Sequence, residues 1–254
     1  MPELPPRTNL RVYDNPEEVA RAVASRFVEV SREAIETRGR FSVALAGGST
    51  PKRVYELLAS EEWRAQVAWA RVHVFFGDER CVPPEHPDSN FRMARESLLA
   101  RVPLPAENVR RLRGEGDPAE SAAMYEAALR AFFDGEPWPR FDLVMLGMGD
   151  DGHTASLFPG SPALREQTAW VVAAHVEKLR AYRLTLTLPA INHAENVMFV
   201  VTGASKSERL REVLAAPKVS DPPPAQLVRP TRAPLEWFLD KAAAPDFLDG
   251  LLSS

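Results

Sequence analysis

Residues 141–160 have the sequence FDLVMLGMGDDGHTASLFPG, and this stretch decides the fold that we expect. Its first part, FDLVML at 141–146, is almost wholly apolar, which is typical of a parallel strand covered on both faces. A glycine-rich turn follows and presents Asp150, Asp151 and His153 within four residues. Because ligands bind beyond the carboxyl ends of strands in open parallel sheets, this turn is the first candidate for a functional site.

Segments typical of strands and helices alternate on both sides of this stretch. Strands are predicted at 41–46, 72–76, 170–174, 183–188, 197–202 and 235–239. Helices are predicted at 14–39, 51–58, 89–100, 118–133 and 203–214. This alternation predicts an α/β fold with a doubly wound, mainly parallel sheet. No linker-like change of composition divides the chain, so we expect one domain over 1–254, with a small excursion between 85 and 140 or near 170–190.

The composition narrows the class of protein. With 254 residues, 45% hydrophobic and 26% charged, the chain has the ordinary balance of a globular protein. Its net charge of −4 and the lack of a basic run argue against nucleic acid as a partner. No apolar run approaches the ~18 residues of a membrane span, and no leader pattern opens the chain. Cys81 is the only cysteine, which excludes an internal disulfide, and we expect the cytoplasm as the compartment.

A second turn, GGSTP at 47–51, directly follows a predicted strand. Glycines let backbone amides approach a ligand, hydroxyl groups add donors, and the start of the next helix attracts anions. Such a loop suits a phosphate cradle made by Gly47, Gly48, Ser49 and Thr50. An ordinary strand-to-helix turn, capped by Ser49 or Thr50, explains the same residues.

Two further strand ends carry a cation. The sequence GDER at 77–80 is expected to begin a loop, in which the planar fork of Arg80 suits a phosphate. Asp78 and Glu79 would then point away from that phosphate, toward Arg80 or substrate hydroxyls, and Asp78 is a candidate supporting residue. Lys206 stands in the first turn of a helix, where a cation is unfavourable unless an anion joins it. A surface ion-pair cluster and a solvated lysine are the alternatives, but three such ends at one sheet edge are hard to explain by chance.

His153 is the candidate catalytic residue of the opening stretch. The pattern G-x-G-x-x-G at 147–152 does not indicate a dinucleotide site, because two acids inside it would repel a pyrophosphate and no acid follows at the ribose position. A helix cap or a core histidine is one interpretation of His153. The other is a general base oriented by Asp151, with Asp150 as a second candidate for that supporting role. The histidines show no close metal-ligand spacing, so neither a metal nor another cofactor is expected.

Five blocks of the chain resemble the 6-phosphogluconolactonase family: ALAGGSTP (44–51), FFGDERCVPPEHPDSNFRMARESLL (75–99), LGMGDDGHTASLFPG (146–160), RLTLTLPAIN (183–192) and VTGASKSERL (201–210). The resemblance implies the Rossmann-like sheet of sugar-phosphate isomerases and deaminases. It implies a hydrolase of carbohydrate metabolism, a lactonase of the oxidative pentose phosphate pathway, whose small-molecule partner is a phosphorylated sugar lactone. It also implies that Arg183 lies near the 6-phosphate.

The expected reaction is hydrolysis of 6-phospho-D-glucono-1,5-lactone by a water that His153 deprotonates. Backbone amides of the turn at 149–152, or Arg80 or Lys206, are candidates to stabilise the oxyanion. A glucosamine-6-phosphate deaminase is one alternative, but the Asn-Glu-Pro that the resemblance implies for that enzyme is replaced here by Leu-Phe-Pro at 157–159. A non-catalytic sugar-phosphate sensor is another. A monomer and a small homo-oligomer are equally open.

Overall fold

A six-stranded parallel sheet forms the centre of the fold, in the order β1-β9-β8-β5-β2-β3. The computed structural model describes residues 7–215 and 221–244. In sheet order the strands are β1 (Thr8–Tyr13), β9 (Leu235–Asp240), β8 (Val197–Val201), β5 (Leu143–Leu146), β2 (Phe41–Leu45) and β3 (Val72–Phe76). All residues of β2, β5, β8 and β9 are buried, which confirms that the apolar runs are covered strands.

Helices flank this sheet largely where the sequence predicts them. The longest, α1 (Pro16–Arg38), begins at an Asn15 cap and ends at Gly39, whose φ of 73° favours glycine. The other helices are α2 (Ser49–Leu58), α3 (Glu61–Arg64), α4 (Asn90–Ala94), α5 (Pro118–Phe132), α6 (Leu188–Asn192) and α7 (Ser207–Ala215). Shorter helical turns are η1 (Trp69–Arg71), η2 (Arg95–Leu99), η3 (Ala106–Asn108), η4 (Pro162–Arg165), η5 (Glu177–Leu179), η6 (Ala204–Lys206) and η7 (Pro224–Leu227). No helix in the described ranges is both long and apolar enough to cross a membrane.

The direction of winding reverses between β2 and β5. From β2 the chain steps outward to β3 on one side, and later to β5, β8 and β9 on the other. The loops that leave β2 and β5 therefore diverge at neighbouring strand ends, and such a reversal opens a crevice in a doubly wound sheet. The predicted fold class is confirmed, and the two glycine-rich turns lie on either side of this crevice.

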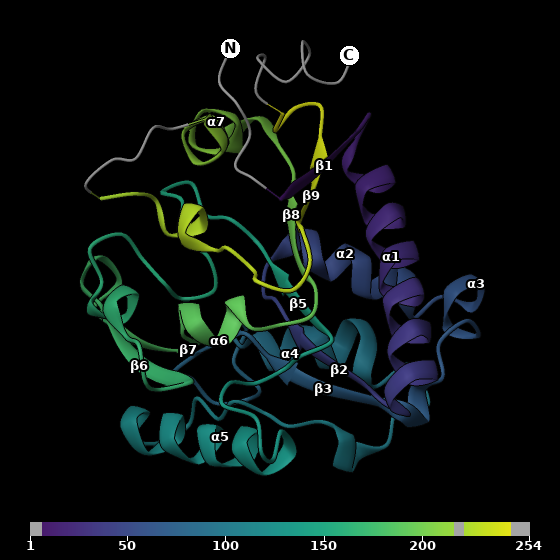
Figure 1. Ribbon diagram of the computed structural model, residues 1–254, viewed down its shortest axis with the longest axis horizontal. Helices are drawn as coiled ribbons and strands as arrows, with labels where there is room; N and C mark the ends of the chain where they lie inside the picture. The colour runs from purple at the N-terminus through teal and green to yellow at the C-terminus, as the bar shows by residue number, and fades with distance from the viewer. Residues whose placement is uncertain (1–6, 216–220, 245–254) are drawn as a thin grey trace.

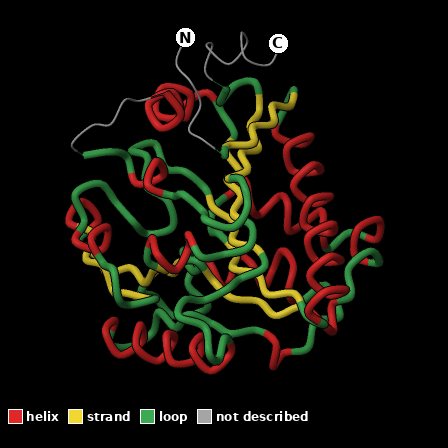
Figure 2. Tube along the Cα trace, in the orientation of Figure 1, coloured by secondary structure: helices red, strands yellow, loops and turns green. Residues whose placement is uncertain are grey.

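A second sheet corrects part of the sequence-based prediction. Its three antiparallel strands are β4 (Asp78–Arg80), β7 (Ala181–Leu186) and β6 (Val171–Val176), in that order. The predicted strands at 170–174 and 183–188 thus form a hairpin outside the parallel sheet, which is the excursion expected near 170–190. The prediction of a loop from Asp78 onward is wrong, because β7 supplies backbone partners for Asp78–Arg80. Figures 1 and 2 show this hairpin apart from the large sheet, with α5 beside it and α1 on the opposite side of the molecule.

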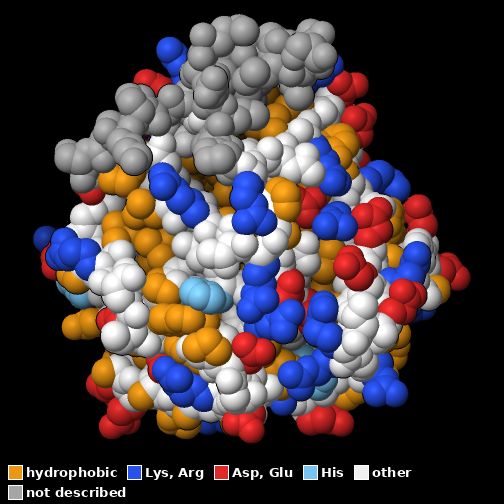
Figure 3. All heavy atoms as spheres, viewed as in Figure 1, with side chains coloured by type: hydrophobic (Ala, Val, Ile, Leu, Met, Phe, Trp, Pro, Cys, Tyr) orange, Lys and Arg blue, Asp and Glu red, His pale blue; other side chains and the backbone are white. Residues whose placement is uncertain are grey.

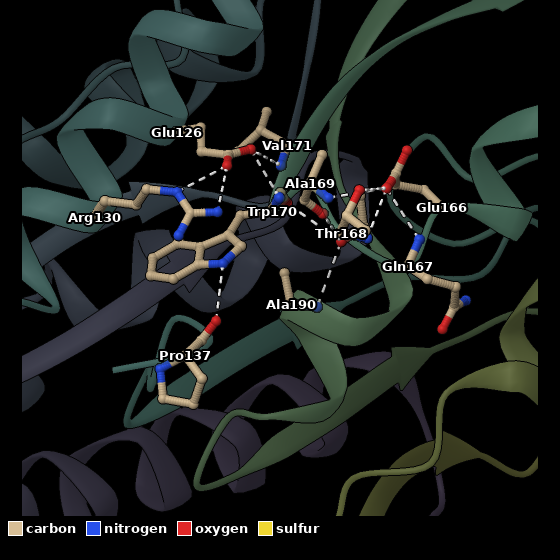
Figure 4. Close-up of polar contacts among 11 residues, drawn as sticks. Glu126, Arg130, Pro137, Glu166, Gln167, Thr168, Ala169, Trp170, Val171 and Ala190 are labelled. Carbon is tan, nitrogen blue, oxygen red and sulfur yellow. Dashed lines mark hydrogen bonds and ion pairs between the residues drawn. The ribbon is translucent and has the colours of Figure 1, made fainter. Parts of the chain in front are cut away.

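Buried polar contacts attach the hairpin to α5 (Figure 4). The Glu126 carboxylate accepts hydrogen bonds from the backbone N–H groups of Trp170 and Val171, at 2.8 and 3.2 Å. The Trp170 indole donates to the Pro137 carbonyl at 3.2 Å, and the Arg130 guanidinium lies 4.4 Å from the Trp170 ring centroid. The start of β6 is therefore held firmly, which positions the strands that follow it.

Strand β1 is another element that the sequence pattern does not predict. Its residues TNLRVY follow a proline-rich start and show only a weak alternation of polar and apolar side chains. The strand pairs along its whole length with β9 at the edge of the sheet. Its partner lies more than 200 residues away in the chain, so local pattern carries little information about it.

Candidate active site

A cavity of about 220 Å³ lies at the crevice between the ends of β2 and β5. It is lined by eight of the predicted site residues: Gly47, Gly48, Ser49, Thr50, Asp78, Arg80, His153 and Lys206. Asp150, Asp151 and Arg183 do not line this cavity, although each lies next to a residue that does. The structure thus brings together turns that are up to 160 residues apart in the sequence.

The turn after β5 presents an Asp–His pair. The Nδ1 atom of His153 lies 2.5 Å from Asp151 Oδ1, which also accepts a hydrogen bond from the His153 backbone N–H at 3.1 Å. Because Nδ1 donates its proton to the carboxylate, the neutral imidazole has its lone pair on Nε2. Within the described residues Nε2 has no hydrogen-bond partner. The ring packs directly on Gly149, where a Cβ atom would lie only 2.1 Å from it.

A lysine that the sequence pattern did not single out completes this pair. The ammonium of Lys178 hydrogen-bonds Asp151 Oδ2. Burial disfavours the charged form of Asp151, but the hydrogen bonds from Lys178 and His153 outweigh that cost and hold its pKa well below the usual range. Lys178 lies 27 residues from Asp151 on the hairpin turn, so no local spacing could have identified it.

Phe158 forms the wall behind the imidazole. Its ring stacks on His153 with a centroid distance of 4.2 Å and an interplanar angle of 27°. Phe158 is 9% exposed, so the stack is largely shielded from water. The sequence showed only that Phe158 cannot transfer a proton. The structure adds that its ring packs against the imidazole of His153, which limits how that imidazole can turn.

On the opposite side of the cavity, the turn after β2 has the form of an anion site. Helix α2 begins with Gly48 at its cap position and has no side-chain cap, so the alternative of capping by Ser49 or Thr50 is wrong. Thr50 Oγ1 instead lies 2.9 Å from Thr202 Oγ1 at the end of β8. Gly47 is required by close packing, since a Cβ there would lie 2.0 Å from the Asn90 side-chain oxygen. The backbone at the start of α2 is left open to an anion.

Two arginines face one another across the small sheet. Arg80 on β4 and Arg183 on β7 are direct partners in the antiparallel register. Like charges in that position are destabilising. Burial and then the charge of Arg80 lower the pKa of Arg183. Among the described residues neither guanidinium forms an ion pair, and their hydrogen bonds go to the backbone oxygens of Asp88 and Tyr182. Asp78 and Asp88 offset part of this charge from a distance, and a bound dianion could supply the direct counter-charge. Figure 3 shows Lys and Arg side chains gathered beside a histidine near the middle of one face.

The acids beside Arg80 do not form the surface cluster that was one interpretation of the sequence. Glu79 is 2% exposed and accepts hydrogen bonds from four donors: the backbone N–H groups of Arg80, Asn90 and Phe91, and the Ser89 hydroxyl. Burial raises the pKa of Glu79, while the backbone donors favour its charged form. Asp78 accepts from Ser156 Oγ at 2.7 Å and from the Asn90 side chain at 3.2 Å. Neither acid binds the Arg80 guanidinium: Glu79 ties β4 to the start of α4, and Asp78 lines the cavity.

Lys206 reaches the cavity from η6 but already has a partner. Its ammonium lies 2.5 Å from Asp150 Oδ1, and this hydrogen bond lowers the pKa of Asp150. Asp150 has 73% of its side chain exposed, whereas Asp151 has 30%. The two adjacent acids therefore differ in position: Asp151 contacts the imidazole, and Asp150 contacts the lysine.

The turn amides offer less to an oxyanion than the sequence suggested. The Gly149 N–H donates to the His153 carbonyl at 2.9 Å, and the Gly152 N–H donates to the Gly149 carbonyl at 3.0 Å. Both amides are therefore consumed in shaping the turn. The backbone amides of Asp150 and Asp151 remain as candidates, as do Arg80 and Lys206, which line the cavity with His153.

Known proteins share both the sequence and the fold of this chain. The model of the family "Glucosamine-6-phosphate isomerases/6-phosphogluconolactonase" matches residues 14–237. A 6-phosphogluconolactonase of Nostoc sp. is 44% identical over 216 residues, which are 84% of this chain and 87% of that protein. One of Synechocystis sp. is 44% identical over 214 residues, 83% of this chain and 86% of that protein. The solved structure of the 6-phosphogluconolactonase from Trypanosoma brucei superposes with a TM-score of 0.83 at 30% identity, over 98% of this chain and 100% of that one. The chain therefore belongs to the family of glucosamine-6-phosphate isomerases and 6-phosphogluconolactonases.

Proposed function

We propose that this protein hydrolyses 6-phospho-D-glucono-1,5-lactone to 6-phosphogluconate in the oxidative pentose phosphate pathway. The observation that carries the proposal is the cavity itself. One wall presents an oriented imidazole, and the opposite wall presents glycine amides and cations. A phosphorylated ester substrate needs both, and the lactonases among the relatives act on such a compound.

In the proposed reaction, His153 Nε2 takes a proton from a water as the water oxygen attacks the lactone carbonyl. The tetrahedral intermediate then expels the ring oxygen, which receives the proton from the imidazolium, and the carbonyl carbon becomes the carboxylic acid. Asp151 supports the transient positive charge on His153 and keeps Nε2 directed at the water. General base catalysis contributes roughly 10²- to 10⁴-fold to such a rate. The step needs only water and these side chains.

In the same proposal, the phosphate binds at the arginine wall, which is the side of the cavity formed by the start of α2 and by Arg80 with its neighbour Arg183. The start of α2 donates backbone N–H groups, and Arg80, Arg183 and Lys206 supply positive charge. Arg183 contributes its charge from the neighbouring strand, since it is the register partner of Arg80 and does not itself line the cavity. The distance between the walls then sets which carbonyl His153 can reach.

The deaminase alternative is disfavoured by Phe158. The position that would carry a glutamate for ring opening holds a buried phenyl ring stacked on His153. A non-catalytic sensor is disfavoured by the intact Asp151–His153 hydrogen bond. Both alternatives predict a protein that leaves the phosphorylated lactone unchanged.

One paired assay tests the proposal. Loss of 6-phosphogluconolactone is followed above its spontaneous rate, beside ammonia release from glucosamine 6-phosphate. We expect fast lactone loss and no ammonia. Ammonia release without lactone loss would establish the deaminase, and binding of both compounds without turnover would establish the sensor.

We further propose that the chain acts in the cytoplasm as one catalytic domain, without nucleic acid as a partner. Support comes from the single cysteine and the net charge of −4. The small sheet carries Arg80 and Arg183 of the arginine wall, so it belongs to the same functional unit as the large sheet. Light scattering of the purified protein distinguishes a monomer from a small homo-oligomer.

A further inference from the structure

Lys178 lies at the tip of the β6–β7 hairpin, in the turn η5. Its ammonium binds Asp151 Oδ2, while Asp151 Oδ1 binds His153 Nδ1 at 2.5 Å. One carboxylate thus joins a lysine on its outer side to the imidazole on its inner side. An exposed lysine–carboxylate pair by itself contributes little to stability. This pair is different because its carboxylate also orients the proposed base.

A cation–π contact also links Lys178 to Phe158, so that Lys178, Asp151, His153 and Phe158 are connected in a closed cycle of contacts. The Lys178 ammonium lies 4.8 Å from the centroid of the Phe158 ring, a distance at which a cation is attracted to the ring face. Phe158 in turn stacks on His153. Lys178 therefore touches both groups that hold the imidazole: the carboxylate at its edge and the phenyl ring at its face.

The base of the β6–β7 hairpin is fixed to the rest of the protein, and this holds Lys178 at the hairpin tip in position. Trp170 and Val171 at the start of β6 are bound to Glu126 of α5, as Figure 4 shows. At the tip, Arg180 adopts the left-handed conformation with a φ of 47°, which closes the turn after η5. The hairpin thus carries Lys178 at its tip, where it binds Asp151, and Arg183 on its second strand, where it pairs with Arg80 of β4.

We propose, on the basis of the hydrolase function above, that Lys178 is a positioning residue that fixes Asp151 and keeps His153 in its uncharged, proton-accepting form. The physical reason is charge balance. With Asp151 alone, the carboxylate favours an imidazolium, and such an imidazolium cannot accept a proton from water. The ammonium of Lys178 offsets that carboxylate without competing for the imidazole, because it binds the other oxygen.

Other charged groups near His153 also affect its protonation: the acids favour its charged form and the cations disfavour it. The cavity is also lined by Asp78 and Arg80 on β4 and by Lys206 on η6, which pairs with Asp150 of the turn that carries His153. These groups are the same in every variant of Lys178. A change in pH dependence on replacing Lys178 therefore reports the loss of this one ammonium.

The test compares Lys178→Met with Lys178→Arg. In Lys178→Met we expect the acid limb of the kcat/KM profile to move to higher pH by about one unit, because a nearby positive charge is lost. Activity should then fall about tenfold at a pH on that limb and lie close to the wild-type value on the plateau. Lys178→Arg keeps the charge and should restore the wild-type profile. Arg180→Met removes a charge from the same turn, at a side chain that touches neither Asp151 nor Phe158, and should leave the profile in place.

A profile of Lys178→Met that coincides with that of the wild type would overturn the proposal. So would an equal loss of kcat at every pH, which is the expectation for a purely structural lysine. Lys178→Gln serves as the second uncharged variant if Lys178→Met is poorly folded.

NMR titration of the His153 imidazole in the substrate-free protein provides the readout that needs no turnover. Its midpoint should rise in Lys178→Met and stay in place in Arg180→Met. An unmoved midpoint in Lys178→Met contradicts the role of Lys178. A wild-type protein that does not hydrolyse the lactone contradicts the proposed function instead, and the titration separates the two failures.

Discussion

The two walls of the cavity differ in how their charges are balanced. At the histidine wall, Asp151 is paired with both Lys178 and His153, and its pKa is held low. At the arginine wall, Arg80 and Arg183 stand opposite one another and, within the described residues, form no ion pair. The charges of the first wall are paired without a ligand, whereas within the described residues no carboxylate forms an ion pair with either arginine of the second.

This difference separates chemistry from recognition. A general base must be correctly oriented before the substrate arrives, so its carboxylate partner is built into the protein. A phosphate site gains most when the ligand itself supplies the missing charge, because bidentate arginine contacts are then formed only in the complex. Changes at the histidine wall should therefore lower kcat, and changes at the arginine wall should raise KM.

The largest effect is expected for His153→Ala. Loss of the base should lower kcat by roughly 10²- to 10⁴-fold, measured as lactone loss above the spontaneous rate. Binding of 6-phosphogluconate, measured by calorimetry, should be retained because the arginine wall is intact. His175→Ala is the matched control, since His175 is exposed and pairs with Glu177 away from the cavity. Near-normal turnover in His153→Ala would disprove the assignment of the base.

Arg183→Ala should give the next largest effect. Loss of the positive charge next to Arg80 should weaken phosphate binding and raise KM for the phosphorylated lactone about 10- to 100-fold, with little change in kcat. Steady-state kinetics with glucono-1,5-lactone as the second substrate provides the control, because that compound lacks the phosphate. An equal rise in KM for both lactones would rule out a phosphate role for Arg183.

Glu79→Gln tests how much the buried carboxylate between β4 and α4 contributes to stability. All four contacts of Glu79 are donors, so an amide would place an N–H group against N–H or O–H groups and leave them unsatisfied. The free energy of unfolding in urea should fall by about 1–3 kcal/mol. Because the pKa of Glu79 is raised on folding, its charge costs stability as pH rises, and the deficit of the variant should be larger at acidic pH than at neutral pH. Glu85→Gln, at an exposed carboxylate, should change the stability little.

The smallest effect is expected for Asp150→Asn. This change frees Lys206 from an exposed ion pair, and KM for the phosphorylated lactone should fall about two- to threefold. The values for glucono-1,5-lactone should stay the same. A loss of kcat instead would show that Asp150 shares the role of Asp151.

The turns of the site could be predicted from sequence because each is local. The fold class follows from the alternation of strands and helices along the whole chain, whereas the turn at 47–50 and the Asp151–His153 pair each depend on residues within one strand end. Contacts between distant segments could not be predicted in this way. Lys178 reaches Asp151 across 27 residues, and the acceptors and donors around Glu79 meet only because β4 packs beside α4. Local polarity suggested exposed acids at 78–79, and tertiary hydrogen bonding made them buried ones.

The different roles of the two walls are tested by one ratio, that of kcat/KM for the 6-phosphorylated lactone to kcat/KM for glucono-1,5-lactone. It is determined for the wild type, His153→Ala and Arg183→Ala. We predict that His153→Ala lowers both values and leaves the ratio nearly unchanged, while Arg183→Ala lowers the ratio about 10- to 100-fold. A ratio that falls strongly in His153→Ala, or that stays at the wild-type value in Arg183→Ala, would contradict the assignment of chemistry to the histidine wall and of phosphate binding to the arginine wall.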